Sequence, residues 1–395
     1  LKDIILKSRW MAGFDAPYIP GWDCHGLPIE SQLTKELGGA KVREMGKVDF
    51  RKTCAEYAMK YVDLQRNDFI RLGVLADWQH PYLTLQREYE VRVIKLFGEL
   101  AEKGYIFRSR KPIHWCIHDG TALAEAELEY EDHVSPSIFV AFAVKELPSG
   151  LQKLKTYLGK LSIVIWTTTP WTLPGNVAVA LHPSYTYVAL KTSKGVYVVA
   201  EGRAEAFANT AGLRDALVIE KIEGSAWEGA ELTHPFLPDR KVVAVLDEMV
   251  TLDQGTGAVH IAPGHGQEDY MVGLKYQLPI VMPVDGKGFL TEEAGPFINH
   301  YVGHDWLIKI KKHEIEKCAN CEIIEYLKGT GALLAQMDIR HSYPHCWRCK
   351  NPVIFRATEQ WFLSVDHEGL RQGSLADIQK TAWYQAWWES MITSM

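Results

Sequence analysis

The sequence predicts an α/β protein whose helix-rich chain is interrupted by a long β-rich segment. Three observations lead to this prediction. Apolar residues recur at helical spacing through most of residues 30–110, strand-like runs separated by turn residues begin near residue 134, and helical spacing returns near residue 369. An insertion leaves and re-enters its host at neighbouring points of the surface. We therefore expect one domain built from residues 1–133 and 336–395, and a second built from residues 134–335.

The composition is that of an ordinary globular protein. The 395 residues are 47% hydrophobic and 23% charged, with a net charge of −6. These values exclude a disordered chain, a collagen-like chain and a disulfide-stapled miniprotein. The acidic balance argues against a dedicated nucleic-acid binder. No apolar run approaches the ~18–20 residues of a membrane helix, and the first ten residues show no signal-peptide pattern. Because residue 1 is Leu, we expect the chain to be part of a longer protein.

Helices dominate the first hundred residues. Apolar spacing predicts a helix over 1–10, followed by a short strand over 18–23 that runs into a loop. A second helix is expected over 49–60 with Asp49 as its N-cap, and a third over 86–103.

Short β-branched and aromatic runs then replace the helical pattern. After them we expect a loop over 341–350 and a helix over 369–381. The expected strands are 105–107, 112–115, 138–144, 161–166, 177–181, 187–191, 196–200, 241–246 and 353–357.

The first candidate site is a strand-to-helix loop over residues 20–30, where Gly and Pro frame two ionisable groups. Ligands of open α/β sheets bind at such loops. Asp23 would hold an ammonium group, while Trp22 and Pro20 would line an apolar pocket. Two other interpretations stay open: a nucleophilic pair of Cys24 with His25, whose adjacent side chains rarely point the same way, and a structural turn.

The second candidate is the run Trp166-Thr167-Thr168-Thr169-Pro170-Trp171-Thr172-Leu173-Pro174-Gly175-Asn176. Alternate side chains of a strand point to opposite faces, so Thr167 and Thr169 would share one side. The alternative is an exposed edge strand, in which Thr is common.

The third candidate is a Gly-rich loop that follows a short apolar strand. The strand delivers His260, and the loop carries His265 and Asp269. Glycine lets a ligand approach the backbone closely. Two imidazoles and a carboxylate favour a polar substrate pocket, with a zinc hydrolase site as the alternative.

Cysteine spacing indicates metal more than disulfides. The count of seven is odd, which favours a reducing compartment. Cys346 and Cys349 form a C-x-x-C knuckle suited to zinc, and Cys116 with His118 or Asp119 would complete four ligands. The alternative is reduced thiols without metal. A second C-x-x-C pair, Cys318 with Cys321, lies in a charged helical stretch over 309–328.

With these motifs in view, the sequence resembles the isoleucyl-tRNA synthetases, which are class I aminoacyl-tRNA synthetases. The resemblance extends along nearly the whole chain. The Thr169-Pro170-Trp171 step favours this family over its valyl and leucyl relatives. The matching blocks are residues 20–30, 111–116, 121–130, 166–176, 255–270, 343–349 and 355–362.

The resemblance implies an incomplete Rossmann-type catalytic domain interrupted by a β-rich editing (CP1) domain. It also implies an activity: condensation of isoleucine with ATP, transfer to the tRNA for isoleucine, and hydrolysis of mischarged valyl-tRNA. Residues 1–133 would be the first catalytic part with its connector, 134–335 the editing domain, and 336–395 the return to the catalytic domain.

Residue roles follow from the same resemblance. Asp23 would bind the amino group of isoleucine, and Trp361 would form a wall of its pocket. Asp269 would bind the amino group of valine in the editing pocket, and His260 would help to exclude isoleucine. Further residues of the two pockets would be Pro20, Trp22, His25 and Gln360 on the synthetic side, and Thr167, Thr168, Thr169, Thr172 and Asn176 on the editing side.

The sequence departs from the family in three respects. The anticodon-binding helical domain is missing, and Cys116-Ile117-His118-Asp119 stands where some members have a second C-x-x-C. The third departure concerns ATP. Neither of the family's two ATP signatures, His-Ile-Gly-His and Lys-Met-Ser-Lys-Ser, occurs in the 395 residues. These groups neutralise the triphosphate in the transition state, so we expect this chain alone to edit but not to aminoacylate. The resemblance implies that the full-length enzyme uses ATP and Mg²⁺, and some members of the family also bind Zn²⁺. It further implies a monomer that is located in the cytoplasm and does not contact a membrane. The alternatives are a stand-alone or degenerate deacylase and a non-catalytic tRNA-binding paralogue.

Overall fold

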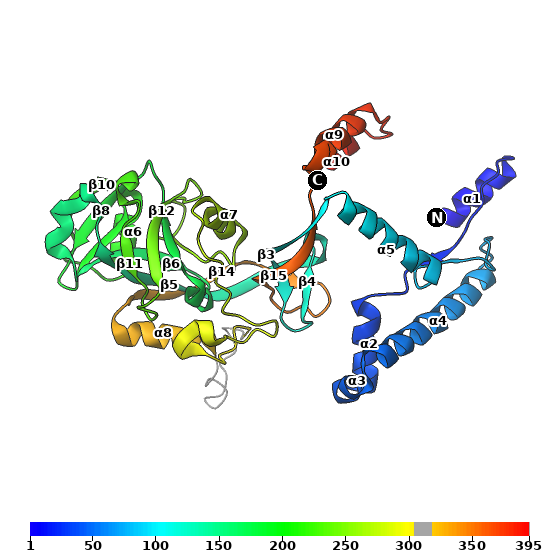
Figure 1. The fold of residues 1–395 in the computed structure, drawn as a ribbon, viewed down its shortest axis with the longest axis horizontal. Coiled ribbons are helices and arrows are strands. Elements are labelled where there is room, and N and C mark those ends of the chain that lie inside the picture. Colours follow the sequence, from blue (N-terminus) through cyan, green and yellow to red (C-terminus); the bar gives the residue numbers. More distant parts are fainter. Residues whose placement is uncertain (304–317, 395) are drawn as a thin grey trace. The chain divides into compact units, whose positions relative to one another are not determined.

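The computed structural model describes residues 1–303 and 318–394 (Figure 1). The chain divides into two compact units. Unit 1 comprises Leu1–Arg108 with Trp361–Met395, and unit 2 comprises Ser109–Gln360. The chain therefore leaves unit 1 once and re-enters it, which makes unit 2 an insertion. No helix in the described residues is long and apolar enough to cross a membrane.

Unit 1 is mainly helical and has a small apolar core. Two short parallel strands pair through Gly21 with Tyr82 and through Trp22 with Leu83. Buried Ala58 and Val62 pack with Leu83. Its elements are α1 (Lys2–Met11), β1 (Gly21–Trp22), α2 (Leu27–Leu37), α3 (Gly39–Met45), α4 (Lys47–Arg71), β2 (Tyr82–Leu83), α5 (Arg87–Glu102), α9 (Leu370–Lys380) and α10 (Trp387–Thr393).

The helix predicted over 49–60 is longer than expected, and its cap was assigned wrongly. α4 begins at Lys47 after Gly46 and continues to Arg71. Asp49 therefore lies in the first turn, where a carboxylate interacts favourably with the helix dipole. The predicted helix over 86–103 is confirmed as α5, which spans Arg87–Glu102 between Gln86 and Lys103.

Unit 2 is built on a mixed sheet. Within the described residues it has ten strands in the order β10-β8-β9-β6-β5-β11-β12-β7-β13, with β14 paired to β5. A smaller sheet has the order β15-β3-β4. The strands are β3 (Ile106–Cys116), β4 (Thr121–Leu123), β5 (Leu128–Glu146), β6 (Leu161–Thr167), β7 (Ala178–Leu181), β8 (Thr186–Lys191), β9 (Val196–Ala200), β10 (Leu217–Glu223), β11 (Glu231–Thr233), β12 (Lys241–Leu246), β13 (Ala258–Ile261), β14 (Leu333–Cys346) and β15 (Ile354–Leu363).

Both faces of the large sheet are buried, which explains its nearly continuous apolar runs. On β5, Val140 and Phe142 face one core while Phe139 faces the other. The helix α8 (Ala319–Thr330) packs into the first core through Leu327, and α6 (Ala204–Thr210) packs into the second through Phe207. The remaining helix of the unit, α7 (Gln267–Lys275), follows β13. The predicted α/β class with a large β-rich part is thus confirmed.

The loop predicted over 341–350 is wrong for residues 341–346, which belong to a strand, whereas residues 347–349 form a turn. Residues 333–346 form β14, which pairs with β5 in antiparallel register, Tyr343 opposite Glu131 (Figure 1). Pro344 hid this strand from the sequence pattern, since proline is rare inside a sheet. The two short strands predicted over 105–107 and 112–115 are one strand, β3.

The cysteine pair in the charged stretch also differs from expectation. Cys318 and Cys321 form a disulfide at the start of α8. The N-cap geometry accounts for the approach, because the Cys321 N–H points at the Cys318 sulfur at 3.2 Å. Residues 309–317 of the predicted helical stretch lie outside the described residues.

Candidate functional site

His260 lies at the centre of the candidate site in unit 2. It sits on β13 opposite Val179 of β7 and is 7% exposed. Its Nε2 lies 3.1 Å from the Thr172 hydroxyl, and its Nδ1 lies 3.5 Å from the Asn176 amide nitrogen. Burial lowers the pKa of His260 to about 4, so the imidazole is neutral at pH 7.

The surrounding hydrogen bonds assign the tautomer of His260. The Thr172 hydroxyl donates its one hydrogen to the Thr169 carbonyl at 2.8 Å. It can then only accept from the imidazole, so Nε2 carries the proton. Nδ1 is left to accept from the Asn176 amide. The ring is held in one orientation from both sides.

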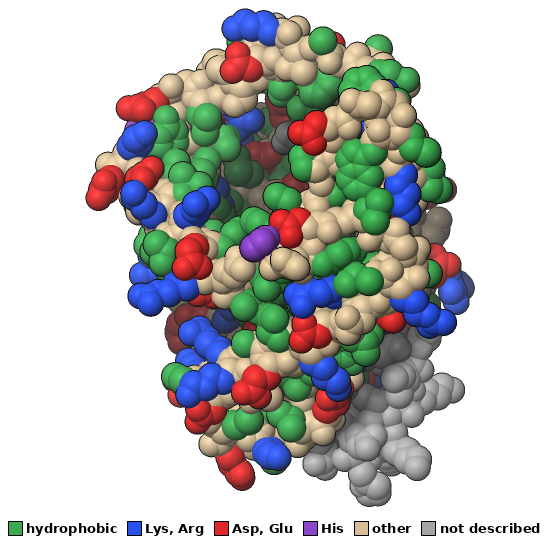
Figure 2. Space-filling view, turned by 90° about the vertical axis from the view of Figure 1, so that its right-hand side faces the viewer, with side chains coloured by type: hydrophobic (Ala, Val, Ile, Leu, Met, Phe, Trp, Pro, Cys, Tyr) green, Lys and Arg blue, Asp and Glu red, His purple; other side chains and the backbone are tan. Residues whose placement is uncertain are grey.

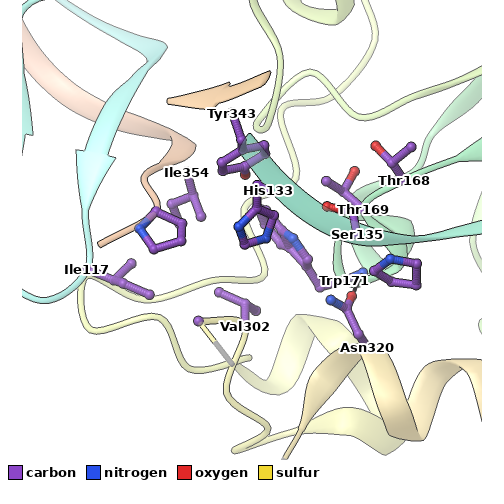
Figure 3. A pocket seen from close by; sticks show the side chains of 13 residues that line it. Ile117, His133, Ser135, Thr168, Thr169, Trp171, Val302, Asn320, Tyr343 and Ile354 are labelled. Carbon is purple, nitrogen blue, oxygen red and sulfur yellow. Dashed lines mark hydrogen bonds between the residues drawn. The ribbon is translucent and has the colours of Figure 1, made fainter. Parts of the chain in front are cut away.

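A chain of hydroxyl groups leads away from His260 along the Thr-rich segment. β6 ends at Thr167, and a 3₁₀ turn over Pro170–Gly175 follows. The Thr169 hydroxyl lies 3.4 Å from that of Thr167 and 3.3 Å from that of Thr172. The three side chains therefore gather on one side, as expected from their spacing for Thr167 and Thr169. Thr168 lines an adjacent small cavity with Trp171 (Figure 3).

Asp269 lies in the first turn of α7. Its Oδ2 accepts the Ala262 N–H at 2.8 Å, directly after the strand that carries His260. The carboxyl keeps part of its surface open, yet the protein packed around it removes most of its hydration. This desolvation, with repulsion from Glu268, raises the pKa of Asp269 to about 7. A neighbouring ammonium group would restore the ionised form.

The glycines of the loop allow this close packing. A Cβ added at Gly264 would lie 2.4 Å from the Val281 carbonyl oxygen, and one at Gly266 would lie 3.1 Å from Cγ of Asp269. A larger residue at Gly266 would press on the Asp269 carboxyl, and one at Gly264 would clash with the Val281 backbone.

Two buried polar atoms beside the site have no hydrogen-bond partner within the described residues: Oδ1 of Asn176 and Nε2 of His265. Buried polar groups are nearly always paired. The ring of His265 packs edge-on against Trp171 with centroids 5.0 Å apart, and its Nδ1 lies 3.0 Å from the Phe355 carbonyl. Both residues are buried, so the two atoms need a partner that the described residues do not supply, such as an ordered water.

The alternative of a zinc hydrolase is not supported. Among residues 1–303 and 318–394, the one group of His, Cys, Asp and Glu spaced for a metal ion is Cys116, Asp119, Cys346 and Cys349. His260, His265 and Asp269 do not form such a group.

The Cys cluster has the ligand chemistry of a zinc centre. Its four ligand atoms lie within 4.8 Å of one another, at the ends of β3 and β14. Sγ of Cys116 lies 3.5 Å from that of Cys349, and Cys346 Sγ lies 3.3 Å from the Asp119 carboxylate. Three sulfurs and one oxygen suit a closed tetrahedral site. Of the two candidates for the fourth ligand, Asp119 lies in this cluster, and His118 is exposed outside it.

The N-terminal candidate residues lie in unit 1 around open hollows. Trp22 and Asp23 line one of about 530 Å³, and His25 lines another of about 690 Å³. The Asp23 carboxylate accepts from the Thr84 hydroxyl at 3.3 Å, and Trp22 donates to Gln65 at 2.8 Å.

The remaining predicted residues of the synthetic site have different surroundings. Pro20 is buried directly before β1. Trp361 is 60% exposed and packs edge-on against Phe97 of α5. Gln360 lies in unit 2, where its amide donates to the Thr358 hydroxyl at 3.1 Å.

Sequence reasoning missed residues that hold the 3₁₀ turn from outside. His234 lies 2.9 Å from the Leu173 carbonyl, and burial lowers its pKa to about 3. The Arg240 guanidinium donates to the carbonyls of Pro174 and Glu293. Neither His234 nor Arg240 belongs to a sequence motif, so their role becomes visible only from their contacts with the turn in the structure.

Comparisons with known proteins identify the family of the chain. The family described as tRNA synthetases class I (I, L, M and V) matches residues 1–395. Isoleucine–tRNA ligases of Thermotoga maritima and Fervidobacterium pennivorans are each 50% identical to the chain, and that of Desulforamulus reducens is 47% identical. Each alignment covers 100% of this chain but 40% of the relative. The chain thus spans about two fifths of the length of these relatives.

Solved structures resemble the chain only slightly. A Plasmodium knowlesi cytosolic leucyl-tRNA synthetase editing domain has a TM-score of 0.31 at 14% identity, covering 37% of this chain and 63% of that one. The P. falciparum counterpart has a TM-score of 0.30 at 15% identity, covering 36% and 67%. The family match, in contrast, extends over the whole sequence, and the chain therefore belongs to the class I tRNA synthetases of the I, L, M and V group.

Proposed function

We propose that the chain is the part of an isoleucine–tRNA ligase that contains the hydrolytic site for valyl-tRNA. The observation that carries this proposal is the Asp269 carboxyl, which accepts the N–H of Ala262 two residues after the neutral His260. His260 in turn faces a chain of Thr hydroxyls. An ammonium group beside Asp269 would place the ester of an aminoacyl-tRNA among hydroxyl and imidazole groups. The whole-chain match to isoleucine–tRNA ligases supports this substrate.

The hydrolysis needs water and no protein nucleophile. Asp269 would bind the ammonium of the amino acid, and the hydroxyls of Thr167 and Thr169 would hydrogen-bond the ester and the terminal adenosine. Thr172 would line the same pocket and hold His260. Neutral His260 donates through Nε2 and cannot act as a base at that nitrogen. Its proposed role is therefore to limit the space for the amino-acid side chain. Water then attacks the ester carbonyl, and the valine carboxylate and the tRNA hydroxyl leave.

The need for a second site follows from the energetics of small side chains. One methylene in an apolar pocket is worth only ~1–3 kcal/mol, a limit for which isoleucine against valine is the standard example. A synthetic site that binds isoleucine must therefore also accept valine. A hydrolytic pocket that admits valine and excludes isoleucine removes the error.

The synthetic site would take isoleucine, ATP with Mg²⁺, and the tRNA for isoleucine. Asp23 is open to a hollow of unit 1 that Trp22 also lines, which suits an amino acid with an ammonium group and an apolar side chain. Because the sequence holds neither ATP signature, we expect no pyrophosphate exchange with isoleucine from this 395-residue chain. Robust exchange would refute this expectation. The deacylase-only and non-catalytic alternatives are not favoured, since the relatives are named ligases.

Hydrolysis of valyl-tRNA for isoleucine by the purified chain tests the proposal. Wild type is expected to accelerate release of valine, and Asp269→Ala to reduce it by about 10²-fold or more, since the ammonium loses its only assigned counter-charge. Glu268→Ala is the matched control, because Glu268 is an exposed neighbour on the same turn. Equal inactivity of wild type and Asp269→Ala at saturating tRNA would remove the support for this function.

We also propose that Cys116, Asp119, Cys346 and Cys349 hold a zinc ion. The ion would join the turn after β3 to the turn after β14 and take no part in hydrolysis, because its four ligands leave no open position.

A further inference from the structure

The backbone N–H of Trp171 is held by a side chain from a distant element. Trp171 lies at the start of the 3₁₀ turn, where backbone N–H groups have no partner within the turn itself. The residue before the turn, Thr169, makes no side-chain cap bond. The N–H of Trp171 instead donates to Oδ1 of Asn320 at 3.0 Å, across 149 residues of sequence.

Bulk water has little access to this N–H, because Trp171 is 5% exposed. Without Asn320 the N–H would lose its protein acceptor. Figure 3 shows the Asn320 side chain reaching from α8 toward Trp171, beside Thr169. The cavity that these residues share is about 40 Å³, which holds one or two waters but no amino-acid ester. Asn320 therefore acts through the turn and not by touching a substrate there.

The turn carries two side chains that shape the hydrolytic site. Thr172 follows Trp171 directly and holds Nε2 of His260, while the ring of Trp171 packs against His265. A shift of the Trp171 backbone would move both contacts. Geometric tolerance at catalytic sites is small, and a displacement of about 1 Å costs on the order of 10²-fold in rate.

Asn320 is itself held rigidly. The Cys318–Cys321 disulfide closes the turn around it, and the Ala319 N–H donates to the Tyr301 carbonyl at 3.0 Å. Ala319 is fully buried, and Ile323 of the same helix lies in the main core. The Asn320 side chain, which accepts the hydrogen bond, is therefore attached to a well-packed part of unit 2.

We propose that Asn320 is a positioning residue for the hydrolytic site, acting as a remote cap for the Thr-rich turn through the Trp171 N–H. This inference rests on the proposed function for its effect on catalysis, but its structural part does not. An Asp at position 320 keeps a carboxylate oxygen for the bond and suits the first turn of a helix. An Ala removes the acceptor.

Hydrogen exchange of the full chain followed by mass spectrometry tests the structural part without any substrate. In the segment 170–176 the two prolines contribute no amide, so Trp171 supplies one of the five exchanging amides. We expect Asn320→Ala to speed exchange there by at least about tenfold, with β8 and β9 unchanged. Asn320→Asp should retain wild-type protection, and so should Asn209→Ala, an exposed control on α6. Wild-type protection in Asn320→Ala would overturn the proposal.

Valyl-tRNA hydrolysis tests the catalytic part on the same variants. We expect the rate at saturating tRNA to fall at least about tenfold in Asn320→Ala and to be restored in Asn320→Asp. A loss in Asn320→Ala that Asn320→Asp does not restore would overturn the positioning role. If wild type hydrolysed nothing, the proposed function would fail while the exchange result still decided whether Asn320 caps the turn.

Discussion

Asp269 carries a carboxyl group whose ionisation depends on what lies beside it. Desolvation raises its pKa from 3.8 to about 7, and the one strong opposing interaction is the Ala262 N–H. An empty site at pH 7 is therefore divided between the neutral and ionised forms. Binding of an ammonium would shift it fully to the ionised form, which links substrate binding to release of a proton.

This shift predicts how stability changes with pH. A carboxyl whose folded-state pKa is raised contributes stability that is fully present below pH 3.8 and is lost as pH rises through about 7. Relative to Asp269→Asn, wild type should therefore lose up to a few kcal/mol of unfolding free energy between about pH 4 and pH 8. Urea unfolding of both proteins across this range measures the difference.

The difference between the two proteins is needed because buried histidines act in the opposite direction. His260 and His265 have pKa values lowered to about 4, so the stability that they contribute is present above pH 6.5 and is lost on acidification. These residues are the same in wild type and Asp269→Asn, and their effect cancels. Parallel stability curves for the two proteins would contradict the raised pKa of Asp269.

The proposed role of His260 in limiting the space for the amino-acid side chain can also be tested. If its ring limits the pocket, His260→Ala should hydrolyse isoleucyl-tRNA at a rate approaching that for valyl-tRNA. The ratio of the two rates should fall by about 10-fold or more, which is the value of a methylene. Thr172→Ser keeps the hydroxyl that holds His260 and should keep the ratio near wild type. An unchanged ratio in His260→Ala would show that another group excludes isoleucine.

At the scale of elements, the ends of β3 and β14 meet at the Cys cluster. Burial raises the pKa of the Cys116 and Cys346 thiols, so without a metal they would stay protonated. Elemental analysis should find about one zinc per chain, reduced in Cys349→Ser. Chelation should lower the melting temperature and leave valyl-tRNA hydrolysis of the still-folded protein unchanged. Loss of hydrolysis on chelation before unfolding would instead place a metal in the reaction.

The elements also show where sequence patterns reach their limit. The apolar runs of β6, β8, β9 and β12 are visible in the sequence, because strands buried on both faces are apolar at nearly every position. β14 was missed although its residues 337–343 alternate between apolar and polar, because Pro344 is a residue that is rare inside a sheet. It becomes a strand only by pairing along β5. Its partner lies more than a hundred residues away, where no local pattern can reveal it.

At the scale of the whole molecule, the two units differ in how much apolar surface they bury. The clusters of the large sheet lie almost entirely within residues 109–360, whereas the core of unit 1 centres on Cys24, Ala58, Val62 and Leu83. Along α5, Val91, Val93, Ile94, Leu96 and Phe97 are all exposed. Figure 2 shows hydrophobic side chains among charged ones on the side that carries α1 and α4.

This contrast predicts that residues 109–360 fold alone. Expressed as a separate polypeptide, they should unfold cooperatively on heating, since the apolar clusters that stabilise the sheet are retained. Phe142→Ala, at a fully buried position, should lower the unfolding free energy by about 3–5 kcal/mol. Circular dichroism measures both. A gradual transition without a defined midpoint would show that unit 2 depends on unit 1 for its stability.

The sequence by itself determined the chemistry that this chain carries. The residue types of the Thr-rich and Gly-His-Gly segments, the C-x-x-C knuckle and the family resemblance are all properties of neighbouring residues. The tertiary structure alone decided which of them meet. In the structure Asp119, and not His118, lies beside Cys346, although Asp119 and Cys346 are 227 residues apart in the sequence. Asn320 likewise lies against Trp171. Such contacts join points far apart in the chain, and their distances are set by sheet register and helix packing, which no local pattern encodes.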